Sequence, residues 1–201
     1  MITDWWEQLT AETYDLWTSR FQPVRELVVD VLPLHPGDVV VDVGCGTGLL
    51  FERLVEAVGP AGRVIGIDAS QDMLHRAQHR IEQHRWSQVS LVHATAAEAD
   101  LPHPADAAVF CTVHDVLQDE PSLDNVLGQL RPRAWVSAVG GQWVHPSVPG
   151  LDLMIFWLHL PYVQDFRRFD HPWTLLSRHL ASWQVREVVA GTGYLLLGRT
   201  A

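Results

Sequence analysis

One stretch decides the fold of this chain: residues 39–48, which read VVVDVGCGTG. Its first five residues form a β-branched run, typical of a strand that is buried on both faces of a parallel sheet. Three glycines follow at alternate positions, and residues 49–54 have the apolar spacing of a helix. A strand, a glycine turn and a helix N-terminus predict a cradle where backbone approaches a ligand closely. An ordinary strand-to-helix loop is the alternative that the rest of the chain has to exclude.

Length and composition predict one globular domain. The chain has 201 residues, of which 47% are hydrophobic and 19% charged, enough for a substantial core without disulfide staples. The net charge of −10 argues against a nucleic-acid partner, because phosphate binding needs a basic surface. Cys45 and Cys111 lack metal-ligand spacing, and no cluster of histidine, cysteine and acidic residues predicts a metal site.

The sequence predicts a cytoplasmic protein without integral membrane association. Residues 1–7 contain neither the basic region nor the apolar run of a signal peptide. The most apolar stretch, residues 151–162, is interrupted by polar residues and is too short to span a bilayer. Two cysteines in predicted buried positions fit a reducing compartment. A monomer and a homodimer both remain open.

Strand and helix patterns alternate along most of the chain. Strands are predicted at residues 39–43, 63–68, 88–93, 106–112 and 133–139, with helices between them and two helices before the first strand. The last two strands, 183–189 and 194–199, are joined by only four residues and must form an antiparallel hairpin. These patterns predict an α/β fold: a Rossmann-like, doubly wound, seven-stranded, mostly parallel sheet with an antiparallel last strand, in a single domain.

Two carboxylates narrow the choice of ligand. Asp42 precedes the first glycine, where it suits a cationic ligand better than a pyrophosphate, and Leu49 stands where a dinucleotide fingerprint needs its third glycine. No Lys-Ser or Lys-Thr pair follows the turn, so a nucleoside triphosphate loop is excluded. Asp68 ends the second strand, where a carboxylate accepts hydrogen bonds from ribose hydroxyls. A helix-capping role is the alternative for Asp68.

At this point the chain resembles the class I S-adenosylmethionine-dependent methyltransferases. Residues 40–48 (VVDVGCGTG) are similar to the first motif of that family almost letter for letter, and residues 64–70 (VIGIDAS) are similar to its second-strand motif. The antiparallel seventh strand also matches the family. The resemblance implies one domain over residues 1–201, with N-terminal cap helices at residues 1–33 and a substrate-cap insert at residues 141–182.

The resemblance also implies a set of cofactor contacts. The glycine turn would wrap the methionyl part, Asp42 would lie near the ammonium or sulfonium, and Asp68 would hold the ribose. Met73 would pack on the adenine edge. The full implied set of cofactor-binding residues is Tyr14, Asp42, Gly44, Cys45, Gly46, Thr47, Gly48, Asp68, Ala69, Met73, Thr95, Ala96, Thr112 and Val113. Thr95-Ala96 departs from the acid-alanine pair of many members, so the adenine contact there is expected to be weaker or to come from a backbone carbonyl.

Two residues are candidates for catalysis. Methyl transfer is an in-line displacement, helped mainly by proximity, and it needs a base only where the nucleophile must lose a proton. His114 follows the fourth strand at the carboxyl edge of the sheet, where open α/β sheets bind ligands. Tyr14, on the N-terminal helix, is expected to hydrogen-bond the cofactor carboxylate. A polar helix-start residue and a core aromatic are the respective alternatives.

Aromatic residues concentrate in the expected cap segments. Such a concentration predicts a pocket for a small apolar, aromatic or amine acceptor, the last held through cation–π contact. A core role is the alternative for each ring. The residues are Trp5, Trp6, Trp17, Trp143, Trp157, Tyr162 and Trp173.

The sequence therefore predicts a methyltransferase that uses S-adenosylmethionine and modifies an oxygen or nitrogen atom of a small molecule. Two other functions stay open. One is a fold relative that binds the cofactor without methyl transfer, as a cyclase or a regulatory module. The other is a methyltransferase that acts on phospholipid amines.

Overall fold

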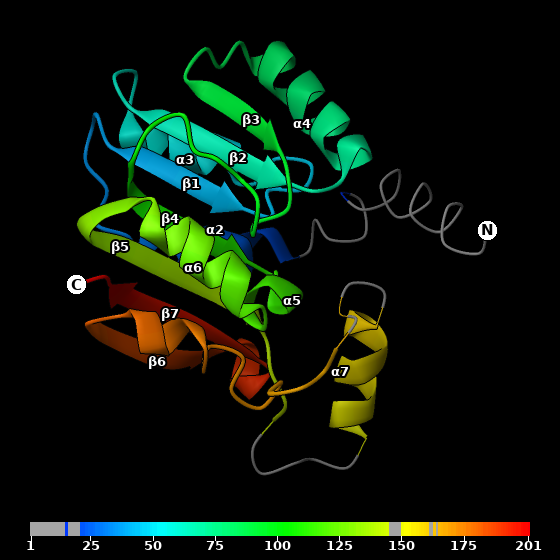
Figure 1. The fold of residues 1–201 in the computed structure, drawn as a ribbon. Coiled ribbons are helices and arrows are strands. Elements are labelled where there is room, and N and C mark those ends of the chain that lie inside the picture. Colours follow the sequence, from blue (N-terminus) through cyan, green and yellow to red (C-terminus); the bar gives the residue numbers. More distant parts are fainter. Residues whose placement is uncertain (1–14, 16–20, 145–149, 161–162, 164) are drawn as a thin grey trace.

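Seven strands form one sheet in a computed structural model that describes residues 15, 21–144, 150–160, 163 and 165–201 (Figure 1). The strand order is β3-β2-β1-β4-β5-β7-β6. The strands are β1 (Val39–Val43), β2 (Arg63–Asp68), β3 (Val89–His93), β4 (Ala105–Cys111), β5 (Leu130–Gly141), β6 (Ser182–Val188) and β7 (Gly193–Arg199). Strands β1 to β5 pair in parallel, whereas β7 is antiparallel to both β5 and β6. The predicted fold class is confirmed.

Helices cover both faces of this sheet (Figure 1). The helices are α2 (Gln22–Asp30), α3 (Phe51–Val58), α4 (Gln71–His84), α5 (His114–Leu117), α6 (Glu120–Gly128) and α7 (Leu151–His159), with 3₁₀ turns η2 (Leu176–His179) and η3 (Val189–Gly191). One core cluster joins α2, α3 and α4 to the sheet, and another joins α5, α6 and η2 to the opposite face. Every residue of β1 is buried, as expected for a strand with four valines among its five residues.

Several element boundaries differ from the sequence-based expectation. The helix after the glycine turn begins at Phe51 rather than at Leu49, because the positive φ of Gly48 (77°) prolongs the turn. Strand β5 begins at Leu130 rather than at Arg133, and its pairing with β7 extends to Gly141. Helices α5 and α7 were not predicted. The helix expected at residues 4–20 lies outside the described residues, apart from Asp15.

Helix α7 stands apart from the sheet layers (Figure 1). Its inner residue Ile155 packs in a small separate cluster with Val163 and Phe169. Its outer face leaves Leu153, Met154 and Trp157 exposed. Among the described residues, no helix combines the length and apolar character needed to cross a bilayer.

A glycine in the middle of β2 provides a test of this packing. A Cβ atom at Gly66 would lie 2.8 Å from Cζ of Phe51 and 2.9 Å from Sγ of Cys45. We expect Gly66→Ala to lower the free energy of unfolding by about 1–3 kcal/mol, because both neighbours are buried and cannot move freely. Urea denaturation measures the change. The control is Gly128→Ala in α6, where the added Cβ meets no atom within 4 Å and stability should not fall. Equal losses in both variants would contradict the packing described here.

Candidate functional site

The glycine turn after β1 lies at the carboxyl edge of the parallel strands, between β1 and α3. Gly44, Gly46 and Gly48 have φ angles of 68°, 56° and 77°, a conformation that side chains disfavour. A Cβ atom at Gly44 would lie 2.4 Å from Cγ1 of Val113, so this glycine is required by packing against the end of β4. At Gly46 the same atom would meet no described residue within 4 Å. Among the described residues, the space beside the Gly46 backbone is therefore open.

Asp68 fixes the shape of this turn. Its Oδ2 accepts a hydrogen bond from the backbone N–H of Gly46 at 2.8 Å, and its Oδ1 accepts one from Ser70 at 2.9 Å. Ser70 in turn caps α4 by accepting a bond from Met73. Both alternatives considered for Asp68 thus have a structural basis, since it supports a helix start and stands at the strand end. Each carboxylate oxygen has a further lone pair for a ligand hydroxyl.

Asp42 is an unpaired carboxylate inside the protein. It is 1% exposed, and its Oδ1 has no hydrogen-bond partner among the described residues. Burial, reinforced by the negative charge of Asp68, raises the pKa of Asp42 to about 7. A buried carboxylate without a partner is costly, and a cation would offset that cost. The geometry thus fits the cationic ligand that the sequence predicted at this position.

Thr47 connects the glycine turn to the N-terminal segment. Its hydroxyl donates to Oδ1 of Asp15 at 2.6 Å, and Oδ2 of Asp15 forms an ion pair with Nη2 of Arg80 at 2.6 Å. Arg80 also donates from Nε to the carbonyl oxygen of Thr47 at 3.0 Å. Asp15 is therefore held against the turn by Thr47 and Arg80, and the sequence did not single out Asp15 or Arg80. Tyr14 itself lies outside the described residues.

The end of β4 carries backbone strain. Thr112 has a φ of 56°, which is rare for a β-branched residue, and it is exposed at the same edge as the glycine turn. Its backbone N–H donates to Val139 at 2.8 Å and its hydroxyl to Cys111 at 2.7 Å. Such outliers cluster at functional sites because the surrounding structure must hold them in place. The next residue, Val113, packs beneath Gly44.

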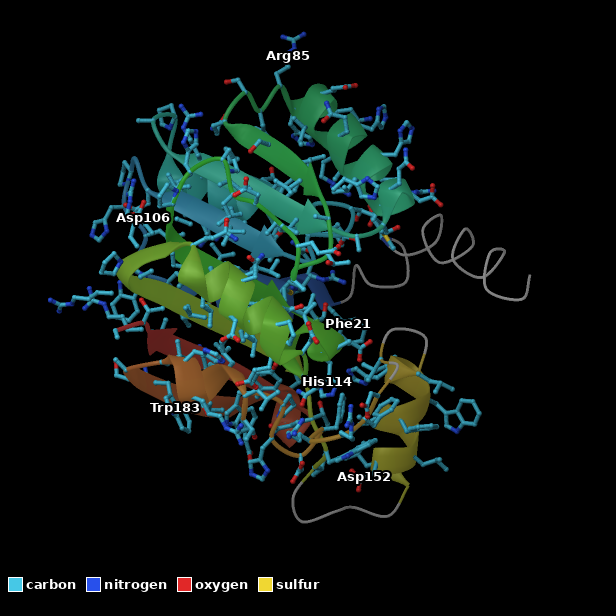
Figure 2. The ribbon with its side chains drawn as sticks, in the orientation of Figure 1. Phe21, Arg85, Asp106, His114, Asp152 and Trp183 are labelled. Atoms are coloured by element: carbon cyan, nitrogen blue, oxygen red, sulfur yellow. The ribbon has the colours of Figure 1, made fainter. Side chains whose placement is uncertain are left out.

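His114 begins α5 and is 7% exposed (Figure 2). Its Nε2 lies 3.2 Å from the carbonyl oxygen of Arg167, and because a carbonyl only accepts, the proton belongs on Nε2. Nδ1 then carries a free lone pair and has no partner among the described residues. Burial lowers the pKa of His114, so the ring is neutral near pH 7. A neutral imidazole with a free Nδ1 is chemically able to accept a proton.

The other implied contacts lie along the same edge, and Ala69 and Thr95 are exposed there. The carbonyl oxygen of Ala69 is 3.1 Å from Nε2 of His93, and Met73 is half-buried in the first turn of α4. The Thr95 hydroxyl donates to Glu98 at 2.9 Å, and Ala96 is buried. Cys45 is also buried, which raises the pKa of its thiol. Among the residues with described positions, no group of His, Cys, Asp and Glu could hold a metal ion.

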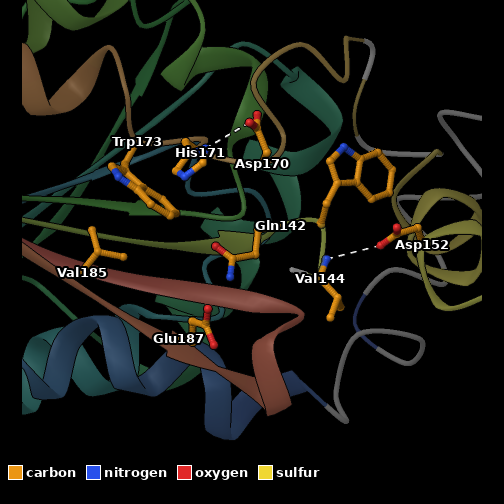
Figure 3. A pocket seen from close by; sticks show the side chains of 9 residues that line it. Gln142, Val144, Asp152, Asp170, His171, Trp173, Val185 and Glu187 are labelled. Carbon is orange, nitrogen blue, oxygen red and sulfur yellow. Dashed lines mark hydrogen bonds and ion pairs between the residues drawn. The ribbon is translucent and has the colours of Figure 1, made fainter. Parts of the chain in front are cut away.

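A second hollow lies beyond β4, around the end of β5. Trp143 and Trp173, two of the aromatic residues singled out in the sequence, line a pocket of about 620 Å³ there (Figure 3). Trp157 does not line it, since this ring is 63% exposed on α7. Trp5, Trp6, Trp17 and Tyr162 lie outside the described residues. Gln142, which also lines the pocket, carries no sequence signal beyond its place after a strand.

The fold and the glycine-turn site resemble those of the class I methyltransferases. Residues 40–133 match the family model described as a methyltransferase domain. The resemblance seen in the motifs is thereby confirmed.

Curated relatives point the same way. A demethylmenaquinone methyltransferase of Bacillus velezensis is 30% identical over 147 residues, covering 71% of this chain and 60% of the relative. One from Bacillus cereus is 30% identical over 125 residues, covering 60% and 52%. The chain thus spans about half to three-fifths of the length of these relatives.

Solved structures share the fold at low sequence identity. A SAM-dependent methyltransferase from Aquifex aeolicus has a TM-score of 0.67 and 18% identity, covering 91% of this chain and 93% of that one. An O-methyltransferase family protein from Burkholderia thailandensis has a TM-score of 0.74 and 14% identity, covering 95% and 59%. The N-methyltransferase NodS from Bradyrhizobium japonicum, in complex with S-adenosyl-L-homocysteine, has a TM-score of 0.60 and 17% identity, covering 90% and 86%.

The raised pKa of Asp42 predicts how stability depends on pH. Between about pH 4 and 7 the folded protein keeps a proton on Asp42 that the unfolded chain has already released, so this residue lowers stability as the pH rises. We expect Asp42→Asn, which cannot ionise, to be more stable than the wild type by on the order of 4 kcal/mol above pH 8, and nearly equal to it at pH 4. Urea denaturation of the ligand-free protein across this range measures the gap. A gap that is constant with pH would show that Asp42 is not desolvated as described.

Proposed function

We propose that the protein is an enzyme that transfers a methyl group from S-adenosylmethionine to an oxygen or nitrogen atom of a small molecule. The observation that carries this proposal is the unpaired buried carboxylate of Asp42 next to the open backbone of Gly46. S-adenosylmethionine has an ammonium and a sulfonium, and either positive centre offsets the cost of burying this carboxylate. The match of residues 40–133 to the methyltransferase domain family model supports the same assignment.

The chain's own residues suffice to hold this cofactor. Asp42 faces its cationic part, the Gly46 backbone approaches the methionyl chain, and the spare lone pairs of Asp68 accept from the ribose hydroxyls. The other contacts implied by the sequence, including Ala69, Met73, Thr95, Ala96, Thr112 and Val113, line the adenine and methyl-donor sides. The bound cofactor supplies an electrophilic methyl group on a good leaving group.

The protein contributes alignment and proton transfer. With the cofactor bound, a bond would form between the acceptor atom and the methyl carbon while the carbon–sulfur bond broke, and the sulfur would leave as a neutral thioether. Where the acceptor is a hydroxyl or a protonated nitrogen, its proton passes to a base, and Nδ1 of His114 is the group that we assign. Alignment of the two reacting atoms contributes most of the rate, up to roughly 7–11 kcal/mol of the barrier.

Two segments are proposed to close the site. Residues 1–33 form the N-terminal cap, which is supported by the contacts of Asp15 with Thr47 and Arg80. Residues 141–182 form the substrate cap. This assignment is supported by the hydrogen bond between the backbone carbonyl of Arg167, within this segment, and His114. Tyr14 is assigned to the cofactor carboxylate as part of the first segment. The proposed enzyme is cytoplasmic.

A methyl-donor assay tests the proposed function. The protein is incubated with S-adenosylmethionine and a metabolite extract, and mass spectrometry follows the cofactor and any product that gains a methyl group. We expect S-adenosylhomocysteine to accumulate together with a methylated product. A cofactor that binds and survives would favour the non-transferring fold relative, and a product confined to lipid extracts would favour the phospholipid amine alternative.

The same assay tests His114. For an acceptor that must lose a proton, His114→Gln should lower kcat by about 10²–10⁴-fold with little change in KM. The matched control is His159→Gln, since His159 also packs on Phe169 (5.3 Å between ring centroids), has a pKa lowered by burial, and bonds Ile155 through Nδ1. Equal losses in both variants would assign His114 a packing role only.

Asp68 is expected to govern cofactor affinity. Asp68→Ala removes an acceptor for the ribose and for the Gly46 amide, so S-adenosylhomocysteine should bind more weakly by on the order of 1.5–3 kcal/mol. Titration calorimetry measures the affinity, and Glu82→Ala, on the exposed end of α4, serves as the control. Unchanged affinity with a lower melting temperature would make Asp68 a purely structural residue.

A further inference from the structure

The pocket at the end of β5 is lined by acidic and aromatic side chains. Residues from four parts of the chain surround its volume of about 620 Å³ (Figure 3). They are Gln142, Trp143 and Val144 after β5, Asp152 on α7, Asp170, His171 and Trp173 before η2, and Val185 and Glu187 on β6.

Gln142 gives the pocket a buried acceptor. The residue is 5% exposed, and its Nε2 donates to the carbonyl oxygen of Gly191 at 3.2 Å, which fixes the orientation of the amide. Its Oε1 is buried and has no hydrogen-bond partner within the described part of the chain. In Figure 3 this oxygen points into the pocket, toward the side of Val185. An unpaired amide oxygen in this position calls for a ligand that donates an N–H or O–H bond.

The charge of the pocket wall indicates which kind of hydrogen-bond donor the ligand carries. Asp152, Asp170 and Glu187 contribute three carboxylates, and no lysine or arginine occurs among its described lining residues. Asp170 pairs with Nδ1 of His171 at 3.0 Å, and this hydrogen bond lowers the pKa of its carboxyl group. Asp152 accepts a bond from the backbone of Val144 at 3.3 Å, whereas Glu187 is exposed. The negative wall favours a cationic donor and disfavours an anion.

Two tryptophans suit the organic part of such a cation. Trp143 packs on Phe166 and Phe169, with ring centroids 5.7 and 4.8 Å apart, and Trp173 packs on Tyr194 at 4.9 Å. These contacts hold both rings in place, so their exposed faces are available without rearrangement. Ammonium groups are attracted to tryptophan faces, most strongly where water is partly excluded.

The pocket also adjoins the proposed methyl-transfer site. Phe169 lies between Trp143, at 4.8 Å, and His114, at 5.0 Å between ring centroids. Only one aromatic ring therefore separates the pocket wall from the histidine assigned as base.

We propose that this pocket binds a primary or secondary ammonium group and that the methyl acceptor carries such a group as its anchor. An N–H of the ligand donates to Oε1 of Gln142, the carboxylates balance its charge, and Trp143 and Trp173 contact its hydrocarbon part. The assignment of the ligand as the acceptor rests on the proposed function, but binding of the ammonium does not. The atom that receives the methyl group is a second oxygen or nitrogen, on the side of His114.

Binding measurements with three matched probes test this proposal. Titration calorimetry compares tyramine, which carries an ammonium, with tyrosol, which carries a hydroxyl in its place, and with 3-(4-hydroxyphenyl)propionate, which carries a carboxylate. We expect tyramine to bind about tenfold or more tightly than tyrosol, and the carboxylate not to bind. Equal affinity for tyramine and tyrosol, or tighter binding of the carboxylate, would overturn the proposal.

Variants then locate the binding. Glu187→Gln should weaken tyramine binding about two- to fivefold, and Gln142→Met about tenfold, with S-adenosylhomocysteine binding unchanged in both. Glu82→Gln on α4 removes the same charge outside the pocket and should leave tyramine binding as it was. If Gln142→Met does not fold, the Glu187→Gln variant and the comparison of the three probes on the wild-type protein still test the proposal. No effect of Glu187→Gln, or an equal effect of Glu82→Gln, would place the probe elsewhere.

The two proposals fail separately. Tyramine binding in a protein that never consumes S-adenosylmethionine would leave the pocket assigned and the methyl transfer wrong. Turnover of S-adenosylmethionine with an extract, without selective tyramine binding, would leave the enzyme assigned and the ammonium anchor wrong.

Discussion

The hydrogen bonds of Asp68 to the amides of Gly46 and Ser70 are the constraint on which the cofactor side of this molecule depends. They tie the loop after β1 to the loop after β2, and these loops meet because parallel strands end at one edge of the sheet. With the turn fixed, the backbone at Gly46 stays open. The same arrangement places a second carboxylate, Asp42, close enough for Asp68 to raise its pKa.

The two aspartates show how environment divides one residue type into two roles. Asp68 is met by backbone amides, which hold its two oxygens in place. Asp42 is buried, its Oδ1 has no partner among the described residues, and its charge is unfavourable in the free protein. A residue that destabilises the free protein while facing a ligand site is typical of binding sites, since the ligand removes the cost. The unfavourable free energy of the buried Asp42 charge therefore favours the binding of a positively charged group beside it.

Much of the fold was predictable because its signals are local. The β-branched run of β1, the glycine turn and the short β6–β7 connection each determine structure within a few neighbouring residues. The cap of α4 is local as well, since Ser70 accepts a hydrogen bond from Met73 three residues later. The start of β5 was missed, because Leu130 pairs with Ala105 of β4, and no local pattern in the sequence reports this contact.

The acceptor side was less predictable because its contacts are distant in sequence. The amide of Gln142 is oriented by Gly191, and His114 is held by Arg167. Asp15 meets Thr47 and Arg80 in the same way, and no spacing rule connects these three residues. The sequence identified Trp143 and Trp173 as pocket candidates by type alone, and it gave Trp157 the same weight although that ring faces outward.

The residues of the cofactor site and the residues of the pocket lie in two separate intervals of the sequence. The cofactor side is encoded between β1 and the start of α5, whereas the pocket residues lie from Gln142 to Glu187. The second segment leaves the sheet after β5 and returns to it at β6, and Gln142 is held at its start by a backbone bond to Thr192 beside β7. With the roles proposed here, recombination that exchanges this one interval between relatives would alter which acceptor is bound and would leave the residues of the cofactor site unchanged. Acceptor specificity in related proteins can therefore change by crossover at the end of β5 and the end of β6, without a compensating change in the glycine turn.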